Sequence, residues 1–478
     1  MTELYTTARQ LLADLKNRRV SARELLEAHA ARQEYLAGSI NAVVATNLTR
    51  ARRDAQAIDD SRSRGETLGP LAGLPMTIKD GFDVEGLPAT SGFSGFAQRP
   101  KDCPDAELVA RTRAAGAVVW GKTNVPFFLS DWQSYNAIYG TTNNPYDVTR
   151  VPGGSSGGAA AALACGITPL EIGSDIGGSL RHPANFCGIC ALKPTWGALP
   201  MRGHVPPPPG MDAEVDLGVA GPMARTVDDL KLLWSVLSRE PERPRQPVKG
   251  MRLAVWDNDP LLPLGRDPKA AVVHAARALA DAGAQVETIA APLETRELLI
   301  EYIRLLTSIM AVGYPDQILA SMNATRDADL NAFAANRDPW SAELFRLGTT
   351  ARPDEILAAQ RARDTLKGHM KAFFERHDAI VMPVAPVTAF AHDHSEPFNA
   401  RVLNMDGETI AYSAMLGWIA LATALHLPSI AVPTGRNVEG MPVGVQIVGA
   451  WNDEARLFDL AAAVEEARGG FSPPATLL

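Results

Sequence analysis

Hydrophobic positions along the chain alternate between short strand-like runs and longer helical stretches. Residues 107–117 and 455–467 are predicted to be helices. Strands that alternate with helices of about ten to fifteen residues are typical of an α/β sheet with helices on its faces. Apolar runs predict strands at LPMTIKD (Leu74 to Asp80) and MRLAVW (Met251 to Trp256). They predict buried strands at AIVMPVAP (Ala379 to Pro386), SIAVP (Ser429 to Pro433) and VGVQIVG (Val443 to Gly449).

Two other regions are predicted to be mainly helical. The first sixty residues have a helical pattern, and Ser21 followed by Glu24 has capping-box spacing just ahead of Leu25 and Leu26. The charged stretch from Glu294 to Lys371 is the least regular part of the chain. We expect it to be a helical insertion that covers a site.

Composition and charge narrow the class of protein. The 478 residues are 46% hydrophobic and 21% charged, which is typical of a folded globular chain rather than a disordered one. The net charge of −8 does not supply the positive field that phosphate backbones attract, so we expect no nucleic-acid partner. Four cysteines do not make a disulfide framework in a chain of this length.

The sequence predicts neither a targeting segment nor a membrane span. The N-terminal residues mix charges from the start and contain no apolar stretch of signal-peptide type. The best membrane candidate, Ser413 to Val432, is interrupted by His426, Pro428 and Ser429. Because a span needs about 20 apolar residues, we interpret this stretch as a buried helix followed by a strand. We therefore expect a cytoplasmic protein without a membrane partner.

Three short motifs match known patterns but lack the context that their chemistry needs. GAVVWGKT (Gly116 to Thr123) fits the phosphate loop, yet its inner residues form a predicted strand where a turn is required. GGSSG (Gly153 to Gly157) fits the nucleophile elbow of α/β-hydrolases, but a polar, turn-rich stretch precedes it. Cys187 and Cys190 form a single CxxC pair, whereas zinc needs further ligands. We expect no nucleotide, no metal and buried thiols.

A stronger signal is the density of glycine and serine between Pro152 and Thr195. Two Gly-Gly-Ser units end at Ser155 and Ser179. Glycines beside a serine let the backbone approach a ligand closely, and consecutive free N–H groups form a nest for an oxyanion. A nucleophilic serine also needs a base. Lys79 ends a predicted strand and can serve if burial keeps it neutral, the alternative being an ordinary surface lysine.

These motifs resemble the amidase signature family. The resemblance is dense over residues 72–237 and looser over 378–467, and it implies the amidase signature fold, an α/β fold whose central mixed β-sheet is covered by helices on both faces. The matching segments are LPMTIKD, GKTN, NNPYD, PGGSSGG, GSDIGGSLRHPANFCG, LKPT, GPMART, LPSIAVPTG and MPVGVQIVG. It implies one domain over 1–478, with N-terminal helices in 1–70, the core and catalytic motifs in 71–237, and a variable helical region over the substrate site at about 290–371.

The resemblance also implies roles for individual residues. Ser179 corresponds to the nucleophile, Ser155 to a bridging serine whose peptide bond with Gly154 is cis, and Lys79 to the base. The backbone N–H groups of Ile176, Gly177, Gly178 and Ser179 would form the oxyanion hole. Gly154, Ser156, Asp175 and Arg181 would support the site, and a purely structural role is equally open for Ser156, Asp175 and Arg181.

The implied reaction is hydrolysis of a carboxylic amide, ester or carbamate through an acyl-enzyme on Ser179. Neutral Lys79 would accept a proton from Ser155, which takes one from Ser179, and water would then release the acyl group by the same relay. The ordinary pKa of lysine is about 10.4, so Lys79 must be buried deeply enough to be largely neutral. No metal or organic cofactor is required.

The main alternative within the family is the glutaminase subunit of a tRNA-dependent amidotransferase. After LKPT the chain reads WGALPMRGHVPPPPG, where that subunit usually has Tyr-Gly-Arg-Val-Ser, and residues 294–371 show no glutamine-binding pattern. We therefore favour an amidase that works without partner subunits. A catalytically dead scaffold protein or a His-dependent hydrolase would fit part of the pattern, but the intact Lys79, Ser155 and Ser179 favour neither.

The sequence identifies the substrate only coarsely. Trp132, Tyr135 and Ile138 precede the serine motif and are candidates for lining an apolar pocket, with ordinary core packing as the alternative. We predict a small-molecule amide substrate with a hydrophobic or aryl group. A homodimer is suggested only by analogy with the family.

Overall fold

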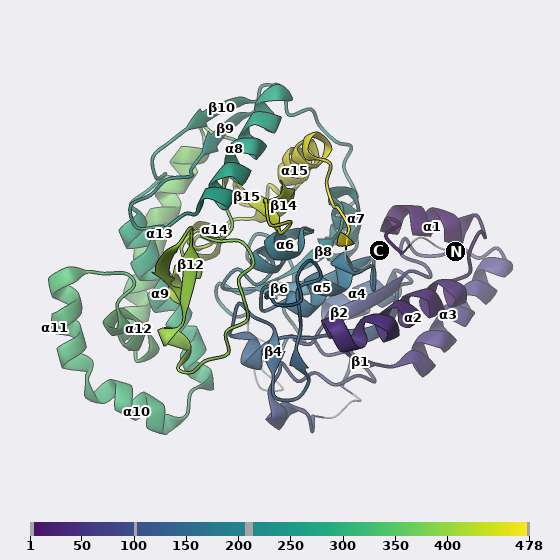
Figure 1. The fold of residues 1–478 in the computed structure, drawn as a ribbon, viewed down its shortest axis with the longest axis horizontal. Helices are drawn as coiled ribbons and strands as arrows, with labels where there is room; N and C mark the ends of the chain where they lie inside the picture. Colours follow the sequence, from purple (N-terminus) through teal and green to yellow (C-terminus); the bar gives the residue numbers. More distant parts are fainter. Residues whose placement is uncertain (1–3, 100–102, 206–213, 476–478) are drawn as a thin grey trace.

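A mixed sheet of eleven strands runs through the centre of the computed structural model, which describes residues 4–99, 103–205 and 214–475 (Figure 1). Its order is β1-β3-β2-β6-β8-β7-β14-β15-β11-β9-β10. Strands β3, β2 and β6 are parallel, and β8, β7, β14 and β15 continue the sheet antiparallel. The strands are β1 (Val43–Thr46), β2 (Pro75–Lys79), β3 (Val118–Thr123), β6 (Leu170–Asp175), β7 (Cys190–Lys193), β8 (Val219–Ala224), β9 (Arg252–Val255), β10 (Gln285–Thr288), β11 (Ala379–Pro383), β14 (Ser429–Arg436) and β15 (Pro442–Gly449).

Helices surround the sheet, and two small hairpins lie outside it. The hairpins pair β4 (Tyr135–Asn136) with β5 (Gly140–Thr141) and β12 (Val402–Met405) with β13 (Glu408–Ala411). The helices are α1 (Ala8–Lys16), α2 (Ala22–Ile40), α3 (Leu48–Ser63), α4 (Glu107–Ala114), α5 (Gly157–Ala164), α6 (Arg181–Cys187), α7 (Val227–Ser238), α8 (Arg266–Asp281), α9 (Thr295–Met310), α10 (Asp316–Ala324), α11 (Arg326–Asn336), α12 (Ala342–Thr349), α13 (Pro353–Phe374), α14 (Ala420–Ala424) and α15 (Glu454–Arg468).

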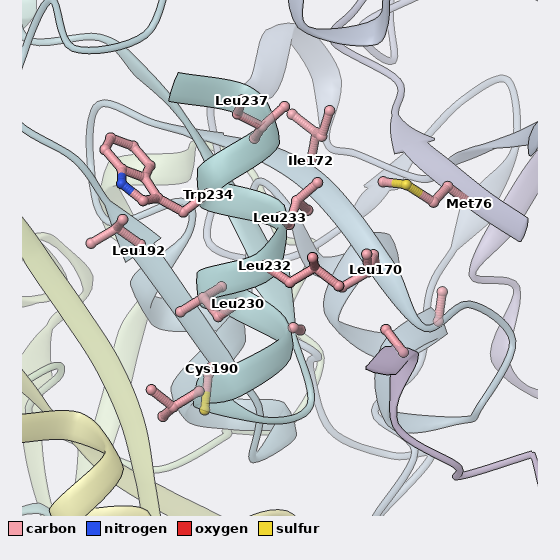
Figure 2. Packing of buried hydrophobic residues seen from close by; sticks show 14 of the residues in the cluster. Met76, Leu170, Ile172, Cys190, Leu192, Leu230, Leu232, Leu233, Trp234 and Leu237 are labelled. Carbon is pink, nitrogen blue, oxygen red and sulfur yellow. The ribbon is translucent and has the colours of Figure 1, made fainter. Parts of the chain in front are cut away.

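Helices cover both faces of the sheet because successive strand residues point to opposite sides. In β7, Cys190 and Leu192 join the core under α7, α8 and α15, whereas Ala191 joins a second core with α5 and α6. Figure 2 shows Leu230, Leu233 and Trp234 of α7 packed over strands β6 and β7. The predicted α/β fold, with a mixed sheet and helices on both faces, is confirmed.

Most predicted elements are present, with adjusted ends. The Ser21–Glu24 capping box begins α2 as predicted. The first sixty residues are not purely helical, since β1 pairs antiparallel with β3 at the edge of the sheet. Residues 294–371 form α9 to α13, which lie at the left of Figure 1, opposite α1 to α3. Within 413–432, α14 and the start of β14 are buried, as predicted.

The sheet brings the segments with the predicted site residues to one edge. β2 and β6 are parallel neighbours, so Lys79 and Asp175, the last residue of each strand, lie at the same edge. The carboxyl ends of parallel strands are where α/β folds usually place a ligand. Helices α5 and α6 begin just after Ser156 and Leu180, so both Gly-Gly-Ser units precede helix N-termini.

Candidate active site

The amine of Lys79 lies at the centre of a group of serines. Its Nζ is 2.8 Å from both the Ser155 and the Ser156 hydroxyls. It is also 3.0 Å from Ser174 Oγ and 3.3 Å from the Ser174 carbonyl oxygen. The Lys79 side chain is fully buried, which excludes the surface lysine that the sequence left open.

Burial changes the protonation of this lysine. Removal from water lowers the pKa of Lys79 from 10.5 to about 7, because the charged form loses its hydration. The carboxyl groups of Asp175 and Glu171 act in the opposite direction. Burial also raises the pKa of Glu171 to about 8, so this acid is mostly neutral at pH 7. A large fraction of Lys79 is therefore neutral near pH 7 and able to accept a proton.

A backbone hydrogen bond joins the two segments that carry the predicted catalytic serines. The peptide bond between Gly154 and Ser155 is cis, as the resemblance implies. A Cβ on Gly154 would overlap the backbone carbonyl of Asp131, so only glycine fits there. The Ser156 N–H donates to the Ser179 carbonyl at 3.2 Å. Within the described residues no hydrogen bond joins the Ser155 and Ser179 hydroxyls. Ser179 keeps 5% of its surface exposed.

The turn from Ile176 to Ser179 presents backbone N–H groups beside the serine. The Gly178 N–H donates to Asp175 Oδ1 at 2.9 Å, so this amide is occupied. No acceptor for the amides of Ile176, Gly177 and Ser179 is found in the part of the chain that the structure describes. This differs from the prediction of four available donors, because Asp175 folds back onto its own turn.

Side chains from distant segments hold the carbonyl side of the same turn. The indole Nε1 of Trp132 donates to the Gly177 carbonyl at 2.9 Å. The hydroxyl of Tyr302, on α9, donates to the Ile176 carbonyl at 3.0 Å. Because the N–H of a trans peptide points away from its C=O, holding the Ile176 carbonyl fixes the direction of the unoccupied Gly177 N–H. Such a fixed set of donors is what stabilises an oxyanion.

Asp175 and Arg181 form a fully buried ion pair under this turn. Arg181 Nη2 is 3.0 Å from Asp175 Oδ1, and Nε is 3.1 Å from Oδ2. Burial acts to raise the pKa of Asp175, but the Arg181 charge and hydrogen bonds hold it well below its usual range. The rest of the Arg181 guanidinium donates to the Ile419 carbonyl, Gln446 and Thr423.

The three predicted pocket residues have different surroundings. Trp132 contacts the turn that precedes Ser179, as described above. The Tyr135 hydroxyl accepts from Arg401 at 2.8 Å, and its ring stacks on His394. Ile138 is half-buried in a turn in which its N–H donates to Asn136. Of these three residues, only Trp132 contacts the turn that carries Ser179.

The motifs that lacked a functional context have structural roles. Lys122, from the GAVVWGKT segment, is buried at the end of β3 with Nζ 3.2 Å from Asp80 Oδ1, so no phosphate loop forms. Cys187 and Cys190 are buried free thiols whose pKa burial raises well above the ordinary value, whereas Cys103 is only partly buried. In residues 4–99, 103–205 and 214–475 no group of three or more His, Cys, Asp or Glu could hold a metal ion.

Sequence reasoning missed several residues that contact this site. Ser174 and Tyr302 were not singled out, nor was His204, whose ring contacts Ser174. His182 is fully buried beneath the turn, and its ring would overlap a Cβ on Gly178, where φ is +90°. Burial lowers the pKa of His182 to about 3, so it is neutral. Only the position of Ser174, beside Asp175 in the GSDIGGS motif, offered a signal.

Known proteins resemble this chain over nearly its whole length. The amidase family model matches residues 24–458. A glutamyl-tRNA(Gln) amidotransferase subunit of Synechococcus sp. (strain CC9605) is 32% identical, and the match covers 97% of either chain. AtzE of Pseudomonas sp. (strain ADP), a 1-carboxybiuret hydrolase subunit, is 32% identical, over 93% of this chain and 95% of that protein. The structure of 6-aminohexanoate cyclic dimer hydrolase has 26% identity and a TM-score of 0.80, and the match covers both chains fully.

The fold and these relatives define a class: enzymes that hydrolyse amide C–N bonds. The chain belongs to the amidase family, in its amidase signature form. Among the described helices none is both long and apolar enough to cross a bilayer.

Proposed function

We propose that this enzyme hydrolyses a small carboxylic amide through an acyl-enzyme on Ser179. The observation that carries the proposal is Lys79, a buried amine with a pKa lowered to about 7 and 2.8 Å from the Ser155 hydroxyl. A base of this kind is matched to proton transfer near neutral pH. Because no group of comparable basicity contacts Ser155 within the described residues, Lys79 is the base of the proposed relay.

The proposed reaction begins with transfer of the Ser155 proton to Lys79 while Ser155 takes the proton of Ser179. The Ser179 oxygen bonds to the amide carbonyl carbon, and the developing oxyanion is stabilised by the amides of Ile176, Gly177 and Ser179. The proton returns through Ser155 to the leaving nitrogen as the C–N bond breaks. Water then attacks the acyl-enzyme, and the same relay carries its proton.

The supporting residues fix this geometry in the proposal. Gly154 lets the chain pass Asp131 and places Ser155, and Ser156 accepts from Lys79. Asp175 and Arg181 hold the turn from behind. A ligand bound at Ser179 would lie near Trp132 and near Leu416, which a Cβ on Gly177 would contact. These apolar surroundings favour a hydrophobic or aryl substrate.

A panel of substrates tests this function on the isolated chain. We expect hydrolysis of a p-nitroanilide or an anilide, and no hydrolysis by Ser179→Ala or Lys79→Ala. Fluorophosphonate labelling of Ser179 tests for a nucleophile without requiring the natural substrate, and it separates an enzyme from a dead scaffold. Activity on acetamide alone would contradict the hydrophobic substrate, and full activity of Lys79→Ala would contradict the relay.

A second candidate is a glutaminase subunit that passes ammonia to a partner. It is favoured by the 32% identity to the glutamyl-tRNA(Gln) amidotransferase subunit over 97% of either chain. In that case glutamine would be the substrate, and activity would depend on added subunits. Glutamine hydrolysis by the lone chain, compared with that of the anilides, distinguishes the two. A cytoplasmic location, a homodimer and the single domain stay predictions, which cell fractionation, light scattering and limited proteolysis test.

A further inference from the structure

A histidine outside the family motifs contacts the hydrogen-bond network of Lys79. His204 belongs to the segment after LKPT in which this sequence departs from the amidotransferase pattern. Its Nε2 is 2.9 Å from Ser174 Oγ, and the same Oγ is 3.0 Å from Lys79 Nζ. A chain of two hydrogen bonds therefore joins the buried lysine to a ring that is only partly buried.

The backbone fixes the place of the His204 ring. The Val205 N–H donates to the Gly81 carbonyl at 2.7 Å, and the Asp83 N–H donates to the Gly203 carbonyl at 2.8 Å. His204 is thus paired with the residues that directly follow β2 and Lys79. Its ring packs edge-on against Phe82, with centroids 4.8 Å apart.

The directions of the hydrogen bonds around Lys79 follow from counting protons. A neutral amine has two N–H donors and one lone pair. Three hydroxyls lie within 3.0 Å of Nζ, those of Ser155, Ser156 and Ser174. Only one of them can donate into the lone pair. The relay requires that this one is Ser155.

The remaining two hydroxyls have acceptors of their own. The Ser156 hydroxyl donates to the Ser174 carbonyl at 3.3 Å, so its oxygen is left to accept from Lys79. The Ser174 hydroxyl can donate to His204 Nε2 when the neutral imidazole carries its proton on Nδ1. Without an acceptor at that position, the Ser174 proton would compete with Ser155 for the lone pair of the lysine.

We propose that His204 is a positioning residue for Lys79: by accepting the Ser174 proton, it leaves the amine lone pair to Ser155. This inference rests on the proposed function, in which Lys79 is the base. His204 touches no reacting atom and acts only through Ser174. It sets the fraction of enzyme in which the relay points from Ser179 through Ser155 to Lys79.

The rate of labelling by a fluorophosphonate depends on this fraction. The Ser179 oxygen bonds to phosphorus, the P–F bond breaks, fluoride leaves, and the serine proton passes through Ser155 to Lys79. The maximal labelling rate, kinact, reports the relay, whereas KI reports binding of the probe. The reaction needs no knowledge of the natural substrate.

Two substitutions at His204 separate hydrogen bonding from packing. His204→Phe keeps a flat ring against Phe82 but has no acceptor, and we expect about a tenfold lower kinact with unchanged KI, the effect of one lost hydrogen bond. His204→Gln offers an amide oxygen, and we expect at least about a third of the wild-type kinact. Wild-type labelling of His204→Phe, or equal losses in both variants, would overturn the inference. His274→Phe, on the exposed face of α8, is the control and should label normally.

Ser174 provides an independent test of the same chain of hydrogen bonds. In Ser174→Ala the competing hydroxyl is absent, so adding His204→Phe should lower kinact no further. Additive losses would overturn the inference, and if His204→Phe does not fold, His204→Leu, which also lacks an acceptor, takes its place in both comparisons. Lys79→Ala distinguishes failure of the proposed relay from failure of the role of His204 alone. If it labels at the wild-type rate, the proposed relay fails and the role of His204 with it; if it does not label while His204→Phe labels normally, only the role of His204 fails.

Discussion

Asp175 and Arg181 form an ion pair with no exposed side-chain surface, directly under the turn that carries Ser179. The same Asp175 carboxylate accepts the N–H groups of Gly178 and Leu180, which lie on either side of the serine. One carboxylate therefore links the guanidinium in the core to the backbone around the candidate nucleophile. The shape of the turn therefore depends on the Asp175 carboxylate, which pairs with Arg181 and also accepts backbone N–H groups of the turn.

Removing the charge of Asp175 should destabilise the folded chain. In Asp175→Asn the Arg181 guanidinium stays buried without its counter-charge, which costs about 3–5 kcal/mol. Urea unfolding of wild type and variant measures this difference. The matched control is Glu466→Gln, which breaks the exposed pair with Arg245 and should cost less than about 1 kcal/mol. Equal costs in the two variants would show that the buried pair is not important for stability.

Activity should depend on pH through Lys79. Burial lowers the pKa of Lys79 to about 7, and only the neutral amine accepts the Ser155 proton. We therefore expect kinact for the fluorophosphonate to fall about tenfold per pH unit well below pH 7 and to level off above it. Rates between pH 5 and pH 9 check this. A rate that does not change between pH 5 and pH 8 would exclude Lys79 as the base.

The same lysine should lower the stability of the fold in a pH-dependent way. Between pH 7 and pH 10.5 the unfolded chain binds a proton at Lys79 that the folded chain lacks, so stability rises with pH in that window. Lys79→Met removes this dependence. The gain in free energy of unfolding from wild type to Lys79→Met should be about 2–3 kcal/mol larger at pH 6 than at pH 9. Chemical denaturation of both proteins at both pH values measures this.

Lys193 provides a matched control for that experiment. It is also fully buried, and burial lowers its pKa to about 7, but it donates to the carbonyls of Pro194 and Leu427. Lys193→Met should also gain more free energy of unfolding at pH 6 than at pH 9, but its Ser179 should still react with the probe. If Lys79→Met changed the free energy of unfolding equally at pH 6 and at pH 9, that result would contradict the lowered pKa of Lys79.

The donors behind the turn should matter for rate more than for binding. Trp132→Phe keeps an aromatic ring beside Tyr412 but removes the donor to Gly177, and Tyr302→Phe removes the donor to Ile176. We expect each variant to lose about 1 kcal/mol of stability and about three- to tenfold in kinact, with KI unchanged.

Trp451→Phe is the control for these two variants. It removes an indole donor to the Leu425 carbonyl, at 2.9 Å, outside the group of residues around Ser179. A similar loss of stability with unchanged kinact is expected. If Trp451→Phe slowed labelling as much as Trp132→Phe, the effect would reflect general loosening and not the turn.

Local patterns were sufficient for much of the fold. The capping box at Ser21 and the apolar runs that became β2, β11 and β15 depend on neighbours a few residues away, and they appear where predicted. β1 was missed because four residues between two helices give little periodic signal. Its strand conformation depends on antiparallel pairing with β3, far along the chain.

The sequence by itself determined the family, the fold class and the segments that meet at the edge of β2 and β6, because glycine-rich turns and buried strands leave marks in local composition. The tertiary structure alone decided how the side chains meet. It buried Lys79 among three serines, gave the Gly178 amide to Asp175, and brought Trp132, Tyr302 and His204 to the turn and its lysine. These contacts join residues that are far apart along the chain, and hydrogen bonds and pKa values depend on distances of a few ångströms that no local pattern records.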